Sequence, residues 1–333
     1  MKVLALNTAD GLAGITLEEI PASEPGPGEV RVALKAASLN HRELWISRGQ
    51  YPGMTLPCTL GADGAGIIEA VGEGVSQAHI GRSVLLYPGL GWGNDPRFPA
   101  ADFGLLGMPG PGTLAERICV PLESAVDIPV FLNFQQAAAI PLAALTAWRG
   151  LTTKGGLQAG ESVLITGVGG GVATFALKFA VAMGARAFVT SGSDATLAKA
   201  SELGAVAGFN YHDPEWRKAL AKQSGGIDVV FDGAPASAYA NYARSLKMGA
   251  RVVIYGSTGG APFTVNAPEL FLKNISLVGT NVGELNEFRQ MIAFIERHLI
   301  EPSLDRVFSL DQAKEGLHYL ESGHQFGKVV VTI

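Results

Sequence analysis

Apolar and polar residues follow two different patterns along the chain. Over residues 1–125, short apolar or alternating segments are separated by turn residues, which is typical of β-strands, and residues 29–35 are the clearest case. From residue 133 onward, strand-like segments recur at regular intervals with helical segments between most of them. The first pattern predicts a β-barrel-like module, and the second predicts βαβ units around a parallel sheet.

The second pattern contains six expected strands, near residues 163–166, 187–190, 207–210, 228–231, 251–255 and 276–278. This number matches a complete doubly wound dinucleotide-binding sheet. The pieces that follow residue 281 are too small to fold alone, so we expect them to return to the first module. The predicted domains are therefore residues 1–124, residues 125–281 and the returning residues 282–333.

A glycine-rich turn follows the first of these strands and precedes a helical segment. Gly167, Gly170 and Ala173 fit a G-x-x-G-x-x-A spacing, whereas Val172 occupies the third glycine position of the more familiar G-x-G-x-x-G pattern. Glycines let the backbone approach a pyrophosphate, and a helix N-terminus favours its charge. The alternative is a tight turn in some other α/β protein, but the six-strand context favours a dinucleotide site.

Charge and cysteine content exclude several classes of partner and site. The 25 basic and 30 acidic residues give a net charge of −5 without a basic tract, which argues against nucleic acid or an anionic membrane as a partner. No apolar run is long enough to span a bilayer, and the N-terminus resembles a strand rather than a secretory signal. Cys58 and Cys119 are too few for a disulfide framework or a cysteine-built zinc site. These observations predict a cytoplasmic protein.

The end of the second strand in the parallel sheet bears on the choice of cofactor. NAD sites usually carry an acid there to bind the ribose 2′-hydroxyl, but this chain has Ser191. The hydroxyl groups of Ser191, Ser193 and Thr196 can donate to a 2′-phosphate, so the sequence favours NADPH. The alternative, that Ser193 and Asp194 begin the next helix, is compatible with this role.

Several motifs resemble the medium-chain dehydrogenase/reductase superfamily over nearly the whole length. Residues 61–66, Gly-Ala-Asp-Gly-Ala-Gly, stand where that superfamily has G-H-E-x-x-G, and residues 137–148, 163–182 and 327–330 add support. The resemblance implies a GroES-like β-barrel catalytic domain and a Rossmann domain with a doubly wound, parallel, six-stranded sheet. Residues 38–45 resemble the zinc-independent quinone oxidoreductase branch.

The chain departs from the zinc-dependent alcohol dehydrogenases of this superfamily at the metal positions. The positions that match their Cys, His and Cys zinc ligands hold Asn40, Ala62 and Leu142, which are poor ligands or none. Arg42 stands at the Ser/Thr position of their proton relay. An irregular insertion at residues 89–112, rich in Gly and Pro, corresponds to their structural-zinc lobe but has no cysteine. We therefore predict a protein without zinc.

The resemblance also implies roles for residues of the first domain. Asn40 is expected close to the nicotinamide and the acceptor, and Tyr51 and Trp45 are expected to line the acceptor site. Ordinary packing is the alternative for the two aromatic residues. Asp63 is interpreted as a buried, hydrogen-bonded residue rather than a proton donor.

Further cofactor contacts follow from the same resemblance. Gly167, with its neighbours in the turn, is expected at the pyrophosphate, and Lys328 is expected to replace a family lysine at the 2′-phosphate, whose own position is Thr196. The sixth strand of the parallel sheet pairs between subunits in many relatives, which implies a homodimer. The other expected cofactor residues are Thr146, Gly170, Gly171, Val172, Ser191, Gly192, Ser193, Tyr211, Tyr255 and Gly256.

These features lead to the hypothesis of a zinc-free, NADPH-dependent oxidoreductase that transfers hydride to a quinone or an α,β-unsaturated carbonyl. Such acceptors take hydride at carbon and need only orientation and a few hydrogen bonds. Two alternatives stay open: an alcohol dehydrogenase-like enzyme with another metal arrangement, and a redox-inactive NADPH-binding protein.

Overall fold

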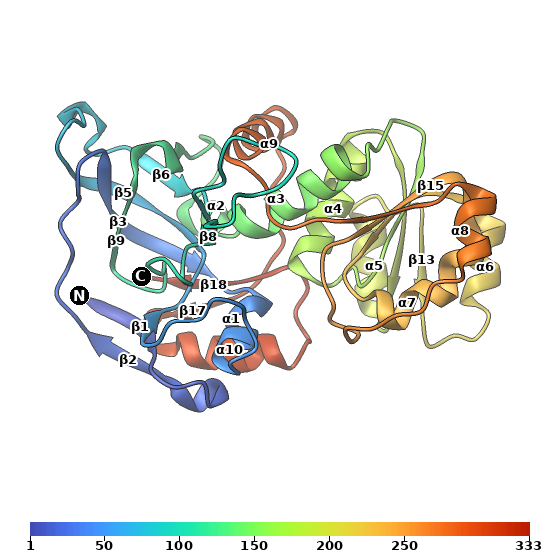
Figure 1. Ribbon diagram of the computed structural model, residues 1–333, viewed down its shortest axis with the longest axis horizontal. Helices are drawn as coiled ribbons and strands as arrows, with labels where there is room; N and C mark the ends of the chain where they lie inside the picture. The colour runs from blue at the N-terminus through green and yellow to red at the C-terminus, as the bar shows by residue number, and fades with distance from the viewer. The chain divides into compact units, whose positions relative to one another are not determined.

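The computed structural model describes residues 1–333 and divides the chain into two compact units (Figure 1). Unit 1 contains Met1–Ala143 and Gly283–Ile333, and unit 2 contains Ala144–Val282. The predicted fold class is confirmed, since unit 1 is a β-rich module built on a seven-stranded sheet and unit 2 contains a six-stranded parallel sheet. The first boundary lies at residue 143 and not at 124, because helix α2 (Phe134–Ala138) packs on strands β3 and β5 of unit 1.

Unit 1 is built on one large sheet with the order β10-β6-β5-β3-β18-β17, to which β9 adds by pairing with β3. The chain returns from the second unit to supply β17 and β18 at the edge of this sheet. Two smaller sheets have the orders β2-β1-β4 and β7-β8. The strands are β1 (Lys2–Leu6), β2 (Ile15–Glu19), β3 (Glu29–Ser38), β4 (Cys58–Thr59), β5 (Asp63–Val71), β6 (Ser83–Leu86), β7 (Gly89–Leu90), β8 (Gly104–Leu105), β9 (Arg117–Pro121), β10 (Ala125–Asp127), β17 (Leu304–Ser309) and β18 (Lys328–Thr332).

Strand β3 lies at the centre of this sheet, and its register brings three strand ends together. It runs antiparallel to β5 and to β18, with Ser38 paired to Asp63 on one side and to Val330 on the other. The alternating residues Val30, Val32 and Leu34 are buried in a core beneath the sheet. As a result, the polar residues at the ends of β3, β5 and β18 lie next to one another.

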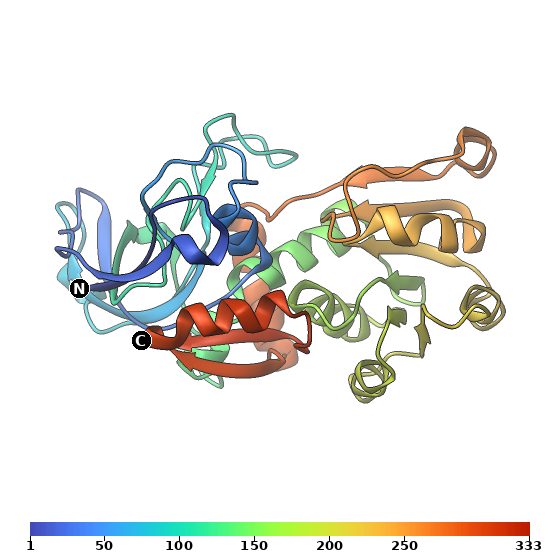
Figure 2. The same cartoon turned by 90° about the horizontal axis from the view of Figure 1, so that it is seen from below.

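The helices of unit 1 pack around these strands. Helix α1 (His41–Ser47) follows β3 directly and contacts α10 (Ala313–Glu321), which lies along β17 and β18 (Figure 2). Helix α9 (Leu285–His298) begins where the chain re-enters the unit. Short 3-10 turns are η1 (Gly11–Gly14), η2 (Gln77–His79), η3 (Leu122–Ser124) and η6 (Leu310–Gln312).

Unit 2 has the strand order β13-β12-β11-β14-β15-β16, and all six strands are parallel. The order reverses between β11 and β14, and doubly wound sheets bind ligands at the carboxyl ends of strands at such a reversal. The strands are β11 (Ser162–Ile165), β12 (Arg186–Ser191), β13 (Ala207–Asn210), β14 (Ile227–Asp232), β15 (Leu246–Ile254) and β16 (Ser276–Gly279). All six segments predicted from the sequence therefore form strands of one sheet.

Helices connect the strands of unit 2 as the βαβ pattern predicts. Helix α4 joins β11 to β12, and α5 joins β12 to β13. No helix of the protein is long and apolar enough to cross a membrane. The helical segments are α3 (Pro141–Arg149, which begins in unit 1), the π-type turn η4 (Gly150–Lys154), α4 (Gly171–Ala182), α5 (Asp194–Glu202), α6 (Trp216–Ser224), α7 (Pro235–Tyr242), η5 (Ala243–Ser245) and α8 (Ala267–Lys273).

Candidate functional site

The glycine-rich turn connects buried strand β11 to helix α4 in unit 2. Gly167 has a φ of +62°, a left-handed conformation that favours glycine, and Gly170 is the N-cap residue of α4. No side chain caps this helix, so its first-turn N–H groups are left for another acceptor. A β-carbon added at Gly167 would meet no atom within 4 Å, which shows open space outside the turn. The turn, with Gly171 and Val172 at the start of α4, therefore fits an anionic pyrophosphate.

A buried hydrogen-bond network joins the ends of β11 and β14 beside this turn. Thr166 Oγ1 donates to Asp232 Oδ1 over 2.7 Å, and Tyr242 Oη donates to Asp232 Oδ2 over 2.7 Å. Asp232 is fully buried, so these bonds compensate for the desolvation of its carboxylate. Burial raises the pKa of Tyr242 well above its usual value. Sequence reasoning missed this network because a single acid at a strand end carries no periodic signal.

Tyr255 and Gly256 follow β15 at the same end of the sheet. The Tyr255 ring stacks on Phe231, with 4.2 Å between the ring centroids, and burial raises the pKa of its hydroxyl. A β-carbon at Gly233 would lie 2.7 Å from the Tyr255 hydroxyl oxygen, so this close approach requires glycine. Thr146, another predicted cofactor contact, is buried on α3.

Of the predicted cofactor residues, Ser191, Gly192, Ser193 and Tyr211 lie together at the end of β12. A β-carbon at Gly192 would lie 2.6 Å from the Tyr211 hydroxyl oxygen and 2.8 Å from His212 Nε2. Ser193 Oγ accepts from the N–H of Thr196 and caps α5, as the alternative interpretation expects, while Ser191 ends the strand. Sequence reasoning missed His212, which could have been found as the neighbour of Tyr211.

A buried cluster of four polar residues lies at the adjoining ends of β3, β5 and β18 in unit 1. We call Ser38, Asn40, Asp63 and Lys328 the Asp63 cluster. Asp63 Oδ2 accepts from Ser38 Oγ at 2.8 Å, Asn40 Nδ2 at 2.9 Å and Lys328 Nζ at 3.1 Å. Its other oxygen, Oδ1, accepts from the N–H of Leu142 at 2.7 Å. Asp63 is thus a buried, hydrogen-bonded residue, as interpreted from the sequence.

Lys328, which the sequence predicts at a 2′-phosphate, belongs to this cluster. Its ammonium donates to Leu39 O at 2.9 Å, Asn40 Oδ1 at 2.6 Å and Asp63 Oδ2 at 3.1 Å. An ammonium has three donors, and all three are used here. The pairing of β18 with β3 places Lys328 beside Asn40 within unit 1.

Asn40 occupies the N-cap position of α1, where its side chain is nearly buried, with 8% exposed. Its backbone N–H donates to Glu43 Oε2 at 2.6 Å. Its side-chain oxygen faces Lys328, and its amide nitrogen uses one hydrogen to bind Asp63. The second amide hydrogen has no acceptor within the protein. Asn40 can therefore donate to an oxygen atom of a bound molecule.

Arg42 links α1 to the insertion and to Tyr51. Its guanidinium donates to Leu106 O at 2.8 Å and Met108 O at 3.2 Å, and lies 5.0 Å from the centre of the Tyr51 ring. The predicted acceptor residue Tyr51 is therefore held against the insertion. The second predicted acceptor residue, Trp45, lies beneath the guanidinium of Arg48, whose central carbon is 5.5 Å from the centre of the Trp45 ring.

Two ionisable groups of α1 have shifted pKa values. Burial raises the pKa of Glu43 to about 7, although the Arg42 guanidinium opposes this shift. Burial also lowers the pKa of His41, helped by the positive charge of Lys328.

The residues at the matched zinc positions do not fit a zinc ion. The amide oxygen of Asn40 faces an ammonium, Ala62 has no donor, and Leu142 offers a backbone N–H to Asp63. The structure contains no group of three or more His, Cys, Asp or Glu side chains that could hold a metal. Because zinc sites use several nitrogen, thiolate or carboxylate ligands, these three positions do not form a zinc site.

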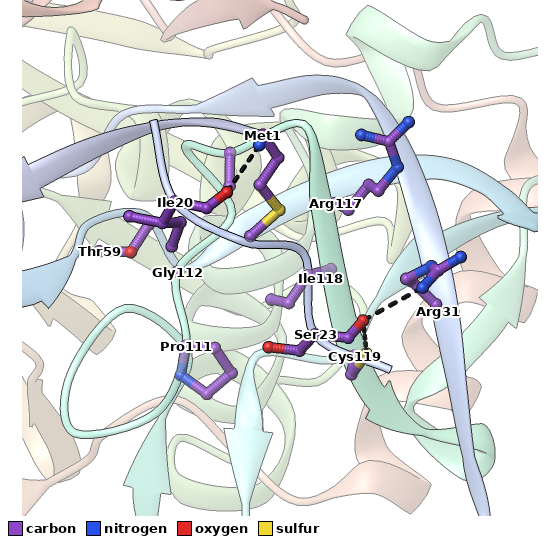
Figure 3. Close-up of a pocket in the computed structure, with 11 residues that line it drawn as sticks. Met1, Ile20, Ser23, Arg31, Thr59, Pro111, Gly112, Arg117, Ile118 and Cys119 are labelled. Atoms are coloured by element: carbon purple, nitrogen blue, oxygen red, sulfur yellow. Dashed lines mark hydrogen bonds between the residues drawn. The ribbon is translucent and has the colours of Figure 1, made fainter. Parts of the chain in front are cut away.

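Two cavities in unit 1 are lined by none of the predicted site residues. One, of about 140 Å³, is bordered by Arg31, Arg117 and Cys119 (Figure 3). Both arginines already pair with Glu69, at 2.6 and 3.0 Å. The other, of about 300 Å³, lies between the start of the insertion and the N-terminus of α9.

Two family models match the chain. "Alcohol dehydrogenase GroES-like domain" matches residues 26–130, and "Zinc-binding dehydrogenase" matches residues 171–297.

Individual proteins are similar over almost the whole chain. The zinc-type alcohol dehydrogenase-like protein YogA of Leptosphaeria maculans is 38% identical over 96% of this chain and 94% of its own length. The acryloyl-coenzyme A reductase of Sulfurisphaera tokodaii is 27% identical over 96% of each chain. A crystal structure described as an NAD-dependent alcohol dehydrogenase is 34% identical, covers 100% of both chains and has a TM-score of 0.95.

Proposed function

The chain belongs to the medium-chain dehydrogenase/reductase superfamily, and from this premise we propose a zinc-free, NADPH-dependent oxidoreductase that transfers hydride to a quinone or an α,β-unsaturated carbonyl. Enzymes of this superfamily are oxidoreductases that use nicotinamide cofactors. The specific acceptor, the phosphorylated cofactor and the independence from zinc are the proposal. The observation that carries it is the fixed amide of Asn40 beside residues that cannot hold a metal.

The cofactor part of the proposal rests on unit 2. The uncapped N-terminus of α4 and the open space at Gly167 fit the pyrophosphate. Because Ser191 and not an acidic residue ends β12, no carboxylate at this position repels a 2′-phosphate. Tyr211 and His212 add hydrogen-bond donors beside it. The similar crystal structure is described as an NAD-dependent alcohol dehydrogenase, so NADH is the alternative cofactor. Measuring activity with NADPH and with NADH distinguishes the two.

The zinc-free part rests on the donor set of unit 1. The name of the fungal relative includes "zinc-type", but Ala62 and Leu142 supply no side-chain ligand here. Without a Lewis acid, a simple ketone has little help in accepting hydride. A conjugated acceptor needs less help because it spreads the arriving negative charge onto its oxygen.

The chemistry divides between the cofactor and this chain. Bound NADPH supplies the hydride. The free N–H of Asn40 donates a hydrogen bond to the acceptor oxygen as it becomes negatively charged. Tyr51, supported by Arg42, offers a flat surface to a planar acceptor. Water supplies the final proton.

The acceptor class is open to direct measurement. NADPH oxidation should be followed with 1,4-benzoquinone, naphthoquinones, 2-alkenals and enoyl-coenzyme A thioesters, beside simple alcohols with NADP and simple ketones. The reductase whose name includes acryloyl-coenzyme A supports including the thioesters. Turnover of at least one conjugated acceptor is expected. Activity with simple alcohols or ketones only would overturn the proposal, and tight NADPH binding without turnover would favour a redox-inactive binding protein.

A further inference from the structure

The Asp63 cluster contains two charged groups that the proposed hydride transfer does not itself require. The side chain of Asp63 is completely buried and that of Lys328 is 3% exposed, with 3.1 Å between Oδ2 and Nζ. Burying an ion pair costs desolvation energy, and apolar residues often stabilise a fold as well or better. The pair therefore calls for a role beyond packing.

The pair determines the orientation of the Asn40 amide. An ammonium only donates hydrogen bonds, and a carboxylate only accepts them. Asn40 Oδ1 lies 2.6 Å from Lys328 Nζ, and Asn40 Nδ2 lies 2.9 Å from Asp63 Oδ2. Turning the amide over would place its NH₂ group against the ammonium and its oxygen against the carboxylate. Only one orientation satisfies both neighbours.

The same contacts make the amide a stronger donor. The hydrogen bond from the Lys328 ammonium draws electron density toward the amide oxygen, which leaves the N–H hydrogens more positive. Hydrogen bonds that involve a charged group are also stronger than neutral ones. The Asn40 amide is thus both fixed in orientation and polarised by its neighbours.

We propose that Lys328 and Asp63 are positioning residues that fix and polarise the Asn40 amide, so that its free N–H stabilises the negative oxygen of the acceptor. This inference rests on the proposed function, because it names the residues that make Asn40 an effective donor. Lys328 thereby has a role in hydride acceptance.

The test uses the double variant Asp63→Asn/Lys328→Met. Changing both residues removes the two charges together and leaves no unpaired charge in the core. The matched control is Asp228→Asn/Lys247→Met, which neutralises a partly buried pair in unit 2 with an N–O distance of 2.7 Å. The two aspartates are matched in one further contact. Asp228 accepts a hydrogen bond from the backbone N–H of Ser162, and Asp63 accepts one from the backbone N–H of Leu142. The control should keep the kcat of the wild type.

Two acceptors of different reactivity separate positioning from general damage. Benzoquinone accepts hydride with little assistance, whereas a 2-alkenal depends on stabilisation of its oxygen. With saturating NADPH, we expect kcat for the 2-alkenal to fall about 100-fold in the double variant, the usual effect of losing one oxyanion donor. The loss with benzoquinone should be several-fold smaller, and the Kd of NADPH should stay unchanged. Lys328→Arg, which keeps a charged donor, should recover part of the 2-alkenal activity.

The outcomes are distinguishable. An equal loss with both acceptors, or an unchanged kcat for the 2-alkenal, would overturn the positioning role. If the double variant does not fold, the single variant Lys328→Arg tests the proposal instead. A positioning role predicts that kcat falls more for the 2-alkenal than for benzoquinone, whereas a purely structural role predicts equal falls. A wild-type protein that reduces no conjugated acceptor would instead refute the proposed function itself.

Discussion

Asn40 and Asn133 offer a direct comparison between two asparagines at helix starts. Asn133 Oδ1 accepts from the N–H of Gln136 at 2.9 Å and caps α2, whereas the Asn40 side chain binds Lys328 and Asp63. We predict that Asn40→Ala lowers kcat for a conjugated acceptor about 100-fold, because it removes the donor to the acceptor oxygen. Asn133→Ala should cost only about 1 kcal/mol of stability, as expected for a helix cap. Steady-state kinetics and thermal unfolding of both variants test this, and equal kcat values would exclude the donor role of Asn40.

Ser191 should decide the preference between the two nicotinamide cofactors. In Ser191→Asp, a carboxylate would repel a 2′-phosphate and accept a hydrogen bond from a ribose 2′-hydroxyl. The ratio of kcat/KM for NADPH to that for NADH should fall at least about 10-fold, equivalent to about 1.4 kcal/mol. Ser201→Asp, on the exposed face of α5, adds the same charge as a control. An unchanged ratio would mean that the 2′-phosphate binds elsewhere.

Single residues were predictable only where a local motif identified them. The glycine turn follows a strand in the sequence, so the place of Gly167 and Gly170 between a strand and a helix could be predicted directly. Lys328 could not, because its neighbours Asn40 and Asp63 depend on the register of β18 and β5 against β3. Ser38 was missed as a partner of Asp63 for the same reason.

At the scale of elements, the first turn of α1 contains a buried carboxyl group that should make stability depend on pH. Burial raises the pKa of Glu43 from 4.5 to about 7 in the folded protein. Between these pH values Glu43 loses its proton in the unfolded chain but keeps it in the folded protein. The protonated Glu43 therefore contributes its full stabilisation of the fold below about pH 4.5, and this contribution is lost as the pH rises toward 7. Glu43→Gln removes this titration.

The comparison of Glu43→Gln with the wild type should therefore change with pH. The difference in free energy of unfolding is expected to shift in favour of the variant between pH 5 and pH 8, by at most about 3 kcal/mol. Denaturant unfolding at both pH values measures it. Parallel pH profiles for the two proteins would show that Glu43 does not titrate in this range.

Regular elements were predicted better than irregular ones. The six strands of unit 2 have strong apolar patterns, and each forms near its expected position. The insertion has no pattern that predicts its path, which depends on contacts such as the bonds from Arg42 to Leu106 and Met108. The same dependence on tertiary contacts placed the unit boundary at residue 143.

At the scale of the whole molecule, we propose a homodimer formed through strand β16. This strand is the edge of the unit 2 sheet, and its unpaired backbone groups can continue the sheet into a second copy. On the nearby helix α8, Phe271 and Leu272 are 65% and 66% exposed to solvent. Sedimentation should show a dimer for the wild type and a shift toward monomer for Phe271→Lys/Leu272→Lys. Val130→Lys, at an apolar residue 95% exposed in unit 1, should stay dimeric, and a monomeric wild type would contradict the proposal.

The central claim is that hydride reaches a conjugated carbon without a metal. The most direct measurement uses chelator-treated protein, NADPH deuterated at the transferred position, and a 2-alkenal, with the product examined by NMR. We expect deuterium on the β-carbon, a retained carbonyl group, and a rate that chelation does not change. Deuterium on the carbonyl carbon of an alcohol product, or activity that returns only with added zinc, would contradict it.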